Sequence, residues 1–115
     1  MNVVLIDNDF NLVKSLEMIM KHKGYMVQSF TDPEKGFNYL NEGGPADVLI
    51  VDYMMPNLTG DELVKKVKKF LSETCKIIMI SGHTNLFGSL DLKNIGIQTF
   101  LPKPLDLGYL FQVIN

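Results

Sequence analysis

The sequence predicts an α/β fold in which five parallel strands form one sheet with helices on both faces. Apolar residues rich in Val and Ile fill residues 3–6 and 48–51 without polar alternation, as is typical of strands buried on both faces of a parallel sheet. Five strand-like segments alternate with helical patterns, and no linker, repeat or low-complexity segment interrupts them. Such alternation indicates parallel strands joined by right-handed crossovers.

The first half of the chain supplies three strands and two helices. The strands are expected over residues 3–6, 25–30 and 48–51. Apolar residues recur at helical spacing from Leu12 to Met20, and Gly24 is suited to end this first helix. Thr31 stands three residues before Glu34 with Pro33 between them. This spacing predicts a capping box at the start of a second helix that runs to residue 41.

The second half is expected to supply two strands, over residues 76–80 and 97–101, and three helices. A turn over residues 57–60 leads into a third helix with Leu63 and Val67 on its apolar face. A fourth helix is expected over residues 84–93, where Gly88 interrupts the apolar stripe. Asp106 is expected to cap a last short helix through residue 113. The prediction is therefore five strands and five helices in one domain, residues 1–115.

Composition excludes several classes of protein. The formal charge of −2 gives no general attraction to nucleic acid or anionic membrane. All eleven basic residues are lysine, so bidentate guanidinium contacts to phosphate are absent. Cys75 is the single cysteine, which excludes an internal disulfide and fits a reducing compartment. The apolar runs are too short to span a bilayer. A cytoplasmic domain without membrane or direct nucleic-acid binding is expected.

Polar residues follow the predicted strands at the edge where the carboxyl ends of parallel strands meet. Carboxylates that approach within about 4 Å repel by several kcal/mol at an effective dielectric near 20, and oxygen ligands favour Mg²⁺ as the compensating cation. A carboxylate beside Mg²⁺ is a competent nucleophile toward phosphorus, and a lysine and a hydroxyl could stabilise the transferred group. The set therefore predicts phosphoryl transfer onto an aspartate. Its members are Asp7, Asn8, Asp9, Asp52, Ser81 and Lys103.

The chain resembles the response regulator receiver domains of two-component systems, as in chemotaxis regulators, over essentially all of its length. The resemblance rests on four motifs in order, which are Leu5-Ile6-Asp7-Asn8-Asp9, Asp52-Tyr53-Met54-Met55-Pro56 with Gly60, Ile80-Ser81-Gly82-His83 and Phe100-Leu101-Pro102-Lys103-Pro104. It implies the flavodoxin-like doubly wound sheet with strand order 2-1-3-4-5. It also implies a phosphorylation-controlled switch rather than a turnover enzyme.

The resemblance implies a role for each site residue. Asp52 is the phosphoacceptor, supplied by a sensor histidine kinase or a phosphotransfer protein. Mg²⁺ is bound by Asp7, Asn8, Asp52 and the backbone carbonyl of Met54. Ser81 and Lys103 contact the phosphate, and the Lys103-Pro104 bond is typically cis. Ser81 and Phe100 form the switch, and Met54 and His83 stand where the family tunes dephosphorylation.

The resemblance also implies an output surface and its partners. The surface is formed by the fourth helix, the fifth strand and the fifth helix. It would contact an output domain, a downstream protein or a second copy in a homodimer. Transcription regulation is one output favoured by the Ser81-Gly82-His83 motif.

Asn8 departs from the family, which usually has an acid at this position. An amide oxygen can bind Mg²⁺ but carries no charge, so weaker metal binding and slower phosphorylation are expected. Asp9 could instead cap the first helix. Two alternatives remain open: a degenerate receiver that acts as a phosphorylation-independent interaction module, and a haloacid-dehalogenase-type phosphatase with Asp7 as nucleophile in an Asp-x-Asp motif. The second leaves Asp52 without a role.

Overall fold

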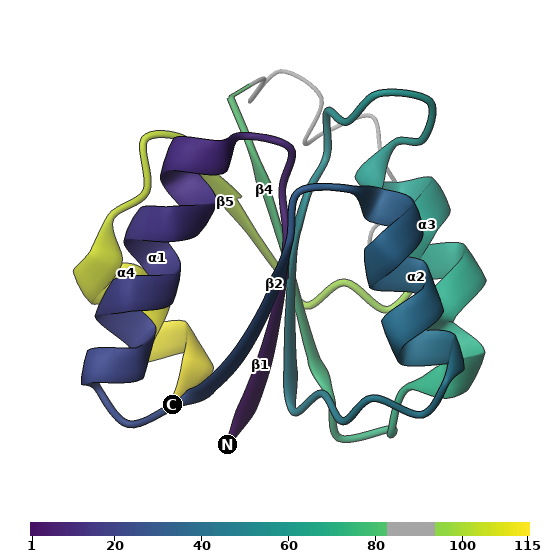
Figure 1. The fold of residues 1–115 in the computed structure, drawn as a ribbon, viewed down its shortest axis with the longest axis horizontal. Coiled ribbons are helices and arrows are strands. Elements are labelled where there is room, and N and C mark those ends of the chain that lie inside the picture. Colours follow the sequence, from purple (N-terminus) through teal and green to yellow (C-terminus); the bar gives the residue numbers. More distant parts are fainter. Residues whose placement is uncertain (83–93) are drawn as a thin grey trace.

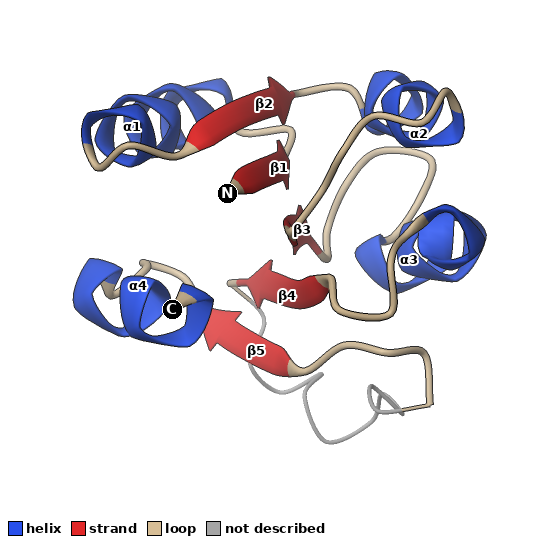
Figure 2. Ribbon diagram, turned by 90° about the horizontal axis from the view of Figure 1, so that it is seen from below, coloured by secondary structure: helices blue, strands red, loops and turns tan. Residues whose placement is uncertain are grey.

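The computed structural model describes residues 1–82 and 94–115 and shows one five-stranded parallel sheet between two layers of helices (Figures 1 and 2). The strand order is β2-β1-β3-β4-β5, which confirms the predicted topology. The strands are β1 (Asn2–Ile6), β2 (Met26–Phe30), β3 (Val48–Asp52), β4 (Lys76–Ser81) and β5 (Thr99–Pro102).

Helices of the described residues cover both faces of the sheet (Figure 2). Helices α1 (Phe10–His22) and α4 (Leu107–Ile114) lie on one face, and α2 (Pro33–Asn41) and α3 (Gly60–Val67) lie on the other. A short 3-10 helix (Lys68–Phe70) extends α3. The helix expected over residues 84–93 lies outside the described residues. No helix in the described ranges has the length and apolar character needed to cross a membrane.

The continuous apolar runs of β1 and β3 are explained by burial on both faces. Successive side chains of a strand point to opposite sides of the sheet. In β1, Val3 and Leu5 pack with α1 and α4, whereas Val4 and Ile6 pack on the side of α2 and α3. All four are fully buried, and burying each aliphatic side chain contributes roughly 1.5–3 kcal/mol. The two strands that lead to the candidate acids are therefore buried on both faces of the sheet, as the sequence predicts.

Capping differs from the sequence prediction at α2. Thr31 is not the N-cap of α2. Asp32 takes this position, in an extended conformation, and its Oδ1 accepts a hydrogen bond from the Glu34 backbone N–H at 2.9 Å. Pro33 occupies the first turn, where its missing N–H leaves no unmet donor. Helix α2 therefore begins one residue later than the Thr31 capping box would require.

Three other helix ends, both ends of α1 and the start of α4, follow their sequence signals. Asp9 caps α1 by accepting from the backbone N–H groups of Asn11 and Leu12, and Gly24 follows its end with a φ of +95°. Asp106 caps α4 through a bond from the Tyr109 N–H. A capping-box pair lies at α3, where Glu62 Oε1 accepts from the backbone N–H and the hydroxyl of Thr59.

Candidate phosphoacceptor site

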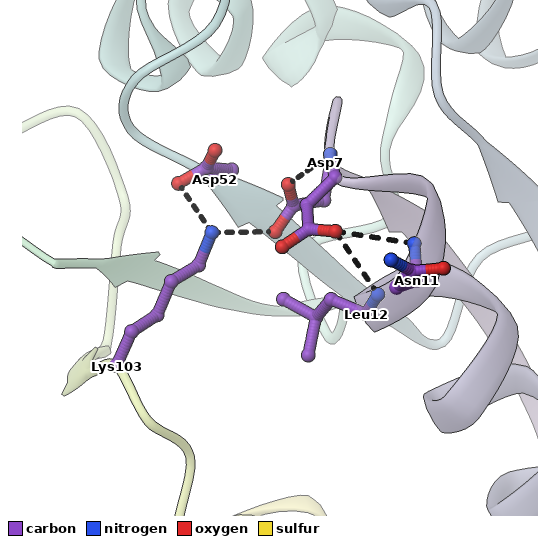
Figure 3. A network of polar contacts seen from close by, with 6 residues as sticks. Asp7, Asn11, Leu12, Asp52 and Lys103 are labelled. Atoms are coloured by element: carbon purple, nitrogen blue, oxygen red, sulfur yellow. Dashed lines mark hydrogen bonds and ion pairs between the residues drawn. The ribbon is translucent and has the colours of Figure 1, made fainter.

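Three strands deliver charged side chains to one edge of the sheet. Asp7 follows β1, Asp52 is the last residue of β3, and Lys103 follows β5. Strand β4 lies between β3 and β5, so the Lys103 side chain reaches across the end of β4 to both acids (Figure 3). Its backbone N–H donates to the Ser81 carbonyl oxygen at 2.9 Å, which fixes the base of the side chain. Asp7 lies 45 positions before Asp52 in the sequence, and Lys103 lies 51 positions after Asp52. The topology of the sheet therefore brings together residues that are far apart in the chain.

The ammonium of Lys103 pairs with both carboxylates. Its Nζ lies 2.9 Å from Asp7 Oδ2 and 3.4 Å from Asp52 Oδ1. Asp7 is fully buried and Asp52 is 3% exposed, whereas 24% of the Lys103 side chain is exposed. Two buried carboxylates thus share one partly exposed ammonium. The excess of negative charge among these three groups favours a cation at the site.

The environment of Asp52 opposes its ionised form. Burial, followed by the nearby Asp7 carboxylate, raises the pKa of Asp52 to about 6, although the Lys103 ammonium acts in the opposite direction. Burial by itself lowers the pKa of Lys103, but hydrogen bonding and attraction to Asp7, then to Asp52, outweigh it and raise the pKa. Lys103 therefore stays charged, and the repulsion between the two acids is only partly relieved.

Asn8 and Met54 are both exposed to solvent and lie beside Asp52. One end atom of the Asn8 amide lies 3.2 Å from the Met54 carbonyl oxygen and 3.2 Å from Asp52 Oδ2. An amide nitrogen at this position donates a hydrogen bond to each of these oxygens. The four groups that the resemblance implies as metal ligands, those of Asp7, Asn8, Asp52 and Met54, therefore converge at one end of the sheet.

The donor set fits Mg²⁺. Asp7 Oδ2 is buried and has the Lys103 ion pair, but it accepts no well-oriented hydrogen bond from the described residues. Within residues 1–82 and 94–115, no three His, Cys, Asp or Glu side chains gather as a metal site, so Asn8 and Met54 would act as neutral ligands. Mg²⁺ commonly binds proteins through one or two carboxylates and retains several waters. The groups present suffice for such a site.

The predicted switch residues share one face of the sheet. Ser81 is fully buried at the end of β4, one position beyond Ile80, which pairs with Asp52. Phe100, on β5, pairs with Met79 of β4. The Phe100 side chain is partly buried and packs against the core on the side of α2 and α3. Ser81 is two residues beyond Met79, so its side chain points to that same face. The Lys103-Pro104 bond is cis, as the resemblance implies. His83 lies outside the described residues.

Gly60 is a site residue whose role the sequence did not reveal. A Cβ atom at Gly60 would lie 2.4 Å from the backbone oxygen of Asp52, and the Gly60 N–H donates to the Tyr53 oxygen at 2.8 Å. The first residue of α3 thus touches the end of β3 through backbone atoms. Asn57, in the turn before it, has a φ of +69°. The signal available in the sequence was a turn over residues 57–60 that ends in glycine, and this signal does not identify the strand that the glycine contacts.

The fold and the site define a class of signalling domain, and sequence comparison identifies it. Residues 3–115 match the response regulator receiver domain family, and the chain belongs to this family. It is 24% identical over 106 residues to the response regulator ArlR of Staphylococcus epidermidis, covering 92% of this chain and 47% of that protein. It is 29% identical over 106 residues to the DNA-binding transcriptional regulator NtrC of Proteus hauseri, covering 92% of this chain and 22% of that protein.

Solved structures support the same assignment. A CheY-like response regulator receiver domain protein from Methanospirillum hungatei superimposes with a TM-score of 0.88 at 25% identity, covering 98% of this chain and 89% of that one. The chain spans less than half the length of ArlR and NtrC. Receiver domains are signalling switches of two-component systems, and family membership disfavours the haloacid-dehalogenase-type alternative.

Proposed function

We propose that residues 1–115 act as a single receiver domain that accepts a phosphoryl group on Asp52 and passes on the resulting change of shape. The observation that carries this proposal is the convergence of two buried carboxylates and the Lys103 ammonium at the carboxyl-terminal edge of the sheet. The donor would be a phosphohistidine of a sensor histidine kinase or a phosphotransfer protein. In the transfer, the phosphorus–nitrogen bond breaks with its electron pair leaving on the donor imidazole. A phosphorus–oxygen bond to Asp52 forms.

Each residue of the site has a role in this reaction. Asp7, Asn8, Asp52 and the Met54 carbonyl would hold Mg²⁺, which when bound supplies positive charge to the phosphoryl oxygens. Lys103, already 3.4 Å from Asp52 Oδ1, would exchange part of its ion pairing with Asp52 for a phosphoryl oxygen. The Ser81 hydroxyl would donate a hydrogen bond to a second phosphoryl oxygen. Met54, which is 49% exposed beside the site, and His83 would set how readily water reaches the phosphoaspartate.

Ser81 and Phe100 would convert phosphorylation into a change of packing. Movement of Ser81 toward the phosphoryl group would open space on the face that it shares with Phe100, and Phe100 would move into that space. Phosphorylation would thereby shift an equilibrium between two arrangements. The output surface that the resemblance implies would include β5 and α4, and its third element, the helix expected over residues 84–93, lies outside the described residues. A downstream protein, an output domain as in ArlR or NtrC, or a second copy of the chain would bind there.

Phosphorylation by a small donor tests the site directly. Incubation with acetyl phosphate and Mg²⁺ should add one phosphoryl group by intact mass, and peptide mapping should locate it on Asp52. Asp52→Asn should abolish the gain, whereas Asp61→Asn, the matched change at a nearby acid on α3, should retain it. A gain that survives Asp52→Asn overturns the site assignment.

The degenerate receiver is the second candidate, favoured by the neutral Asn8 where the family usually has an acid. No phosphoryl gain from acetyl phosphate or from a phosphohistidine donor, at any Mg²⁺ concentration, would support it.

The switch has its own test, in which beryllofluoride and Mg²⁺ should shift the amide resonances of Ser81 and Phe100. Unmoved resonances, in a protein that does take phosphate on Asp52, would overturn the switch while leaving the phosphoacceptor in place.

A further inference from the structure

The Asn8 amide faces two oxygen atoms that can only accept hydrogen bonds. Its end atom lies 3.2 Å from both Asp52 Oδ2 and the Met54 carbonyl oxygen. The residues on either side of Asn8 are anchored, because the Asp7 N–H donates to the Phe30 oxygen at 3.1 Å and the Asp9 N–H donates to Asp7 Oδ1 at 2.9 Å. The backbone of Asn8 is therefore held in place, and rotation of its side chain is the remaining freedom.

The two orientations of this amide suit two different states of the site. With NH₂ toward Asp52, it donates to both oxygens, which is favourable only without a cation between them. With the amide oxygen toward Asp52, three oxygens face one another, which is favourable only with a cation. The 3.2 Å separations are close to the edge of an Mg²⁺ octahedron, about 3.0 Å for metal–oxygen distances of about 2.1 Å. The same backbone arrangement therefore serves both states.

The hydrogen bonds of Asn8 complement the ion pair of Lys103. Lys103 Nζ faces Oδ1 of Asp52, and the Asn8 amide faces Oδ2. Each oxygen of Asp52 thus has a positively polarised partner when NH₂ is turned inward. An aspartate at position 8 would instead add a third carboxylate to a site that has one ammonium for two.

We propose that Asn8 replaces the cation in the metal-free protein. Its NH₂ group donates hydrogen bonds to Asp52 Oδ2 and to the Met54 carbonyl oxygen and so links the two residues. Mg²⁺ binding requires a half-turn of the amide that breaks both hydrogen bonds. The inference rests on the proposed Mg²⁺ and phosphoacceptor site at Asp52. It has two consequences: the site is ordered before Mg²⁺ arrives, and Mg²⁺ binds in competition with a residue of the chain itself.

The side-chain NH₂ resonances of Asn8 report this rotation without any phosphorylation. In ¹⁵N-labelled protein they are assigned as the pair that disappears in Asn8→Asp. In EDTA they should exchange slowly with solvent, and saturating MgCl₂ should shift them and raise their exchange rate by about tenfold or more, because both hydrogen bonds are lost. Resonances that keep the same exchange rate with and without bound Mg²⁺ overturn the proposal.

Mg²⁺ calorimetry and thermal unfolding give independent readouts. Asn8→Asp should bind Mg²⁺ at least about tenfold more tightly, because a charged ligand replaces a neutral competitor, and should melt below the wild type in EDTA and recover with MgCl₂. Asn11→Asp, which adds the same charge on the exposed first turn of α1, should leave affinity and EDTA melting unchanged. Asn8→Ala removes the two hydrogen bonds without adding a charge, so it should also melt below the wild type in EDTA. An unchanged melting temperature of Asn8→Ala in EDTA overturns the role of the amide in the metal-free protein.

The outcomes distinguish this inference from the proposed function. If neither the wild type nor Asn8→Asp binds MgCl₂ in calorimetry, the metal site itself fails. If both bind it and take phosphate on Asp52 while the Asn8 resonances do not respond, the phosphoacceptor stands and the role of Asn8 is overturned.

Discussion

Lys103 Nζ lies 2.9 Å from Oδ2 of Asp7, a side chain that is fully buried, and this ion pair crosses from the end of β5 to the end of β1. Because β3 and β4 lie between these strands, the pair closes the carboxyl-terminal edge of the sheet over Asp52. The lysine that would contact a phosphoryl group on Asp52 therefore also joins the ends of β5 and β1.

Removal of this ammonium should destabilise the metal-free protein. Lys103→Met leaves two buried carboxylates without their shared partner, and the free energy of unfolding should fall by roughly 1–3 kcal/mol, below the full cost of breaking a buried pair because the lysine is partly exposed. Urea unfolding in EDTA measures the loss. Lys65→Met, at an exposed position on α3, should change the stability little. Adding Asp7→Asn to Lys103→Met should recover part of the loss, and strictly additive losses would contradict the pairing.

The opposite change is expected at the phosphoacceptor. Asp52→Asn keeps the shape of the side chain but removes a buried charge that faces Asp7, so the free energy of unfolding in EDTA at neutral pH should rise by roughly 1–2 kcal/mol. Asp32→Asn, where asparagine is an equally good N-cap, should stay within about 0.5 kcal/mol of the wild type. A variant at Asp52 that is less stable than the wild type would show that Lys103 and the Asn8 amide together fully compensate the charge of Asp52.

Gly60 should not tolerate a methyl group. A Cβ atom at position 60 would lie 2.4 Å from the backbone oxygen of Asp52. Gly60→Ala should therefore displace α3 from the end of β3 and lower the free energy of unfolding by roughly 1–3 kcal/mol. Gly108→Ala is the matched control, since among the described residues its Cβ would meet only Asp106 Oδ1, at 3.4 Å in the first turn of α4. Chemical unfolding of both variants measures the difference, and equal stabilities would refute the steric role of Gly60.

Cys75 should be unreactive in the folded protein. Its side chain is 3% exposed, and burial, followed by the nearby Asp47 carboxylate, raises the pKa of the thiol to about 11. A raised thiol pKa means that the reactive thiolate is scarce at neutral pH in the folded state and increases as the pH approaches 11. Labelling by iodoacetamide at pH 7.5 should therefore be slow and should become fast in urea, where the thiol regains a pKa near 8.5. Fast labelling of the native protein would contradict this environment.

Most of the fold was predictable because local patterns determine it. The burial of β1 and β3 on both faces follows from continuous Val and Ile runs, and Gly24 and Asp106 lie at the helix ends where the sequence indicated them. The N-cap of α2 was mispredicted because Thr31 and Asp32 are both good caps in adjacent positions. The choice between them depends on which residue adopts the extended conformation before Pro33, and the capping pattern alone does not decide this.

The candidate site was likewise predictable in part. The sequence by itself determined which side chains stand at strand ends, since strand periodicity and the succession of elements place Asp7, Asp52 and Lys103 there. Only the tertiary structure decided which atoms face one another: the lysine that bridges two acids, the amide of Asn8 turned toward Asp52 and Met54, and the backbone contact at Gly60. The physical reason is that strand ends are set by local burial and backbone pairing. Side-chain contacts across the sheet depend on the order of strands, on rotamers and on charges supplied by residues distant in the sequence.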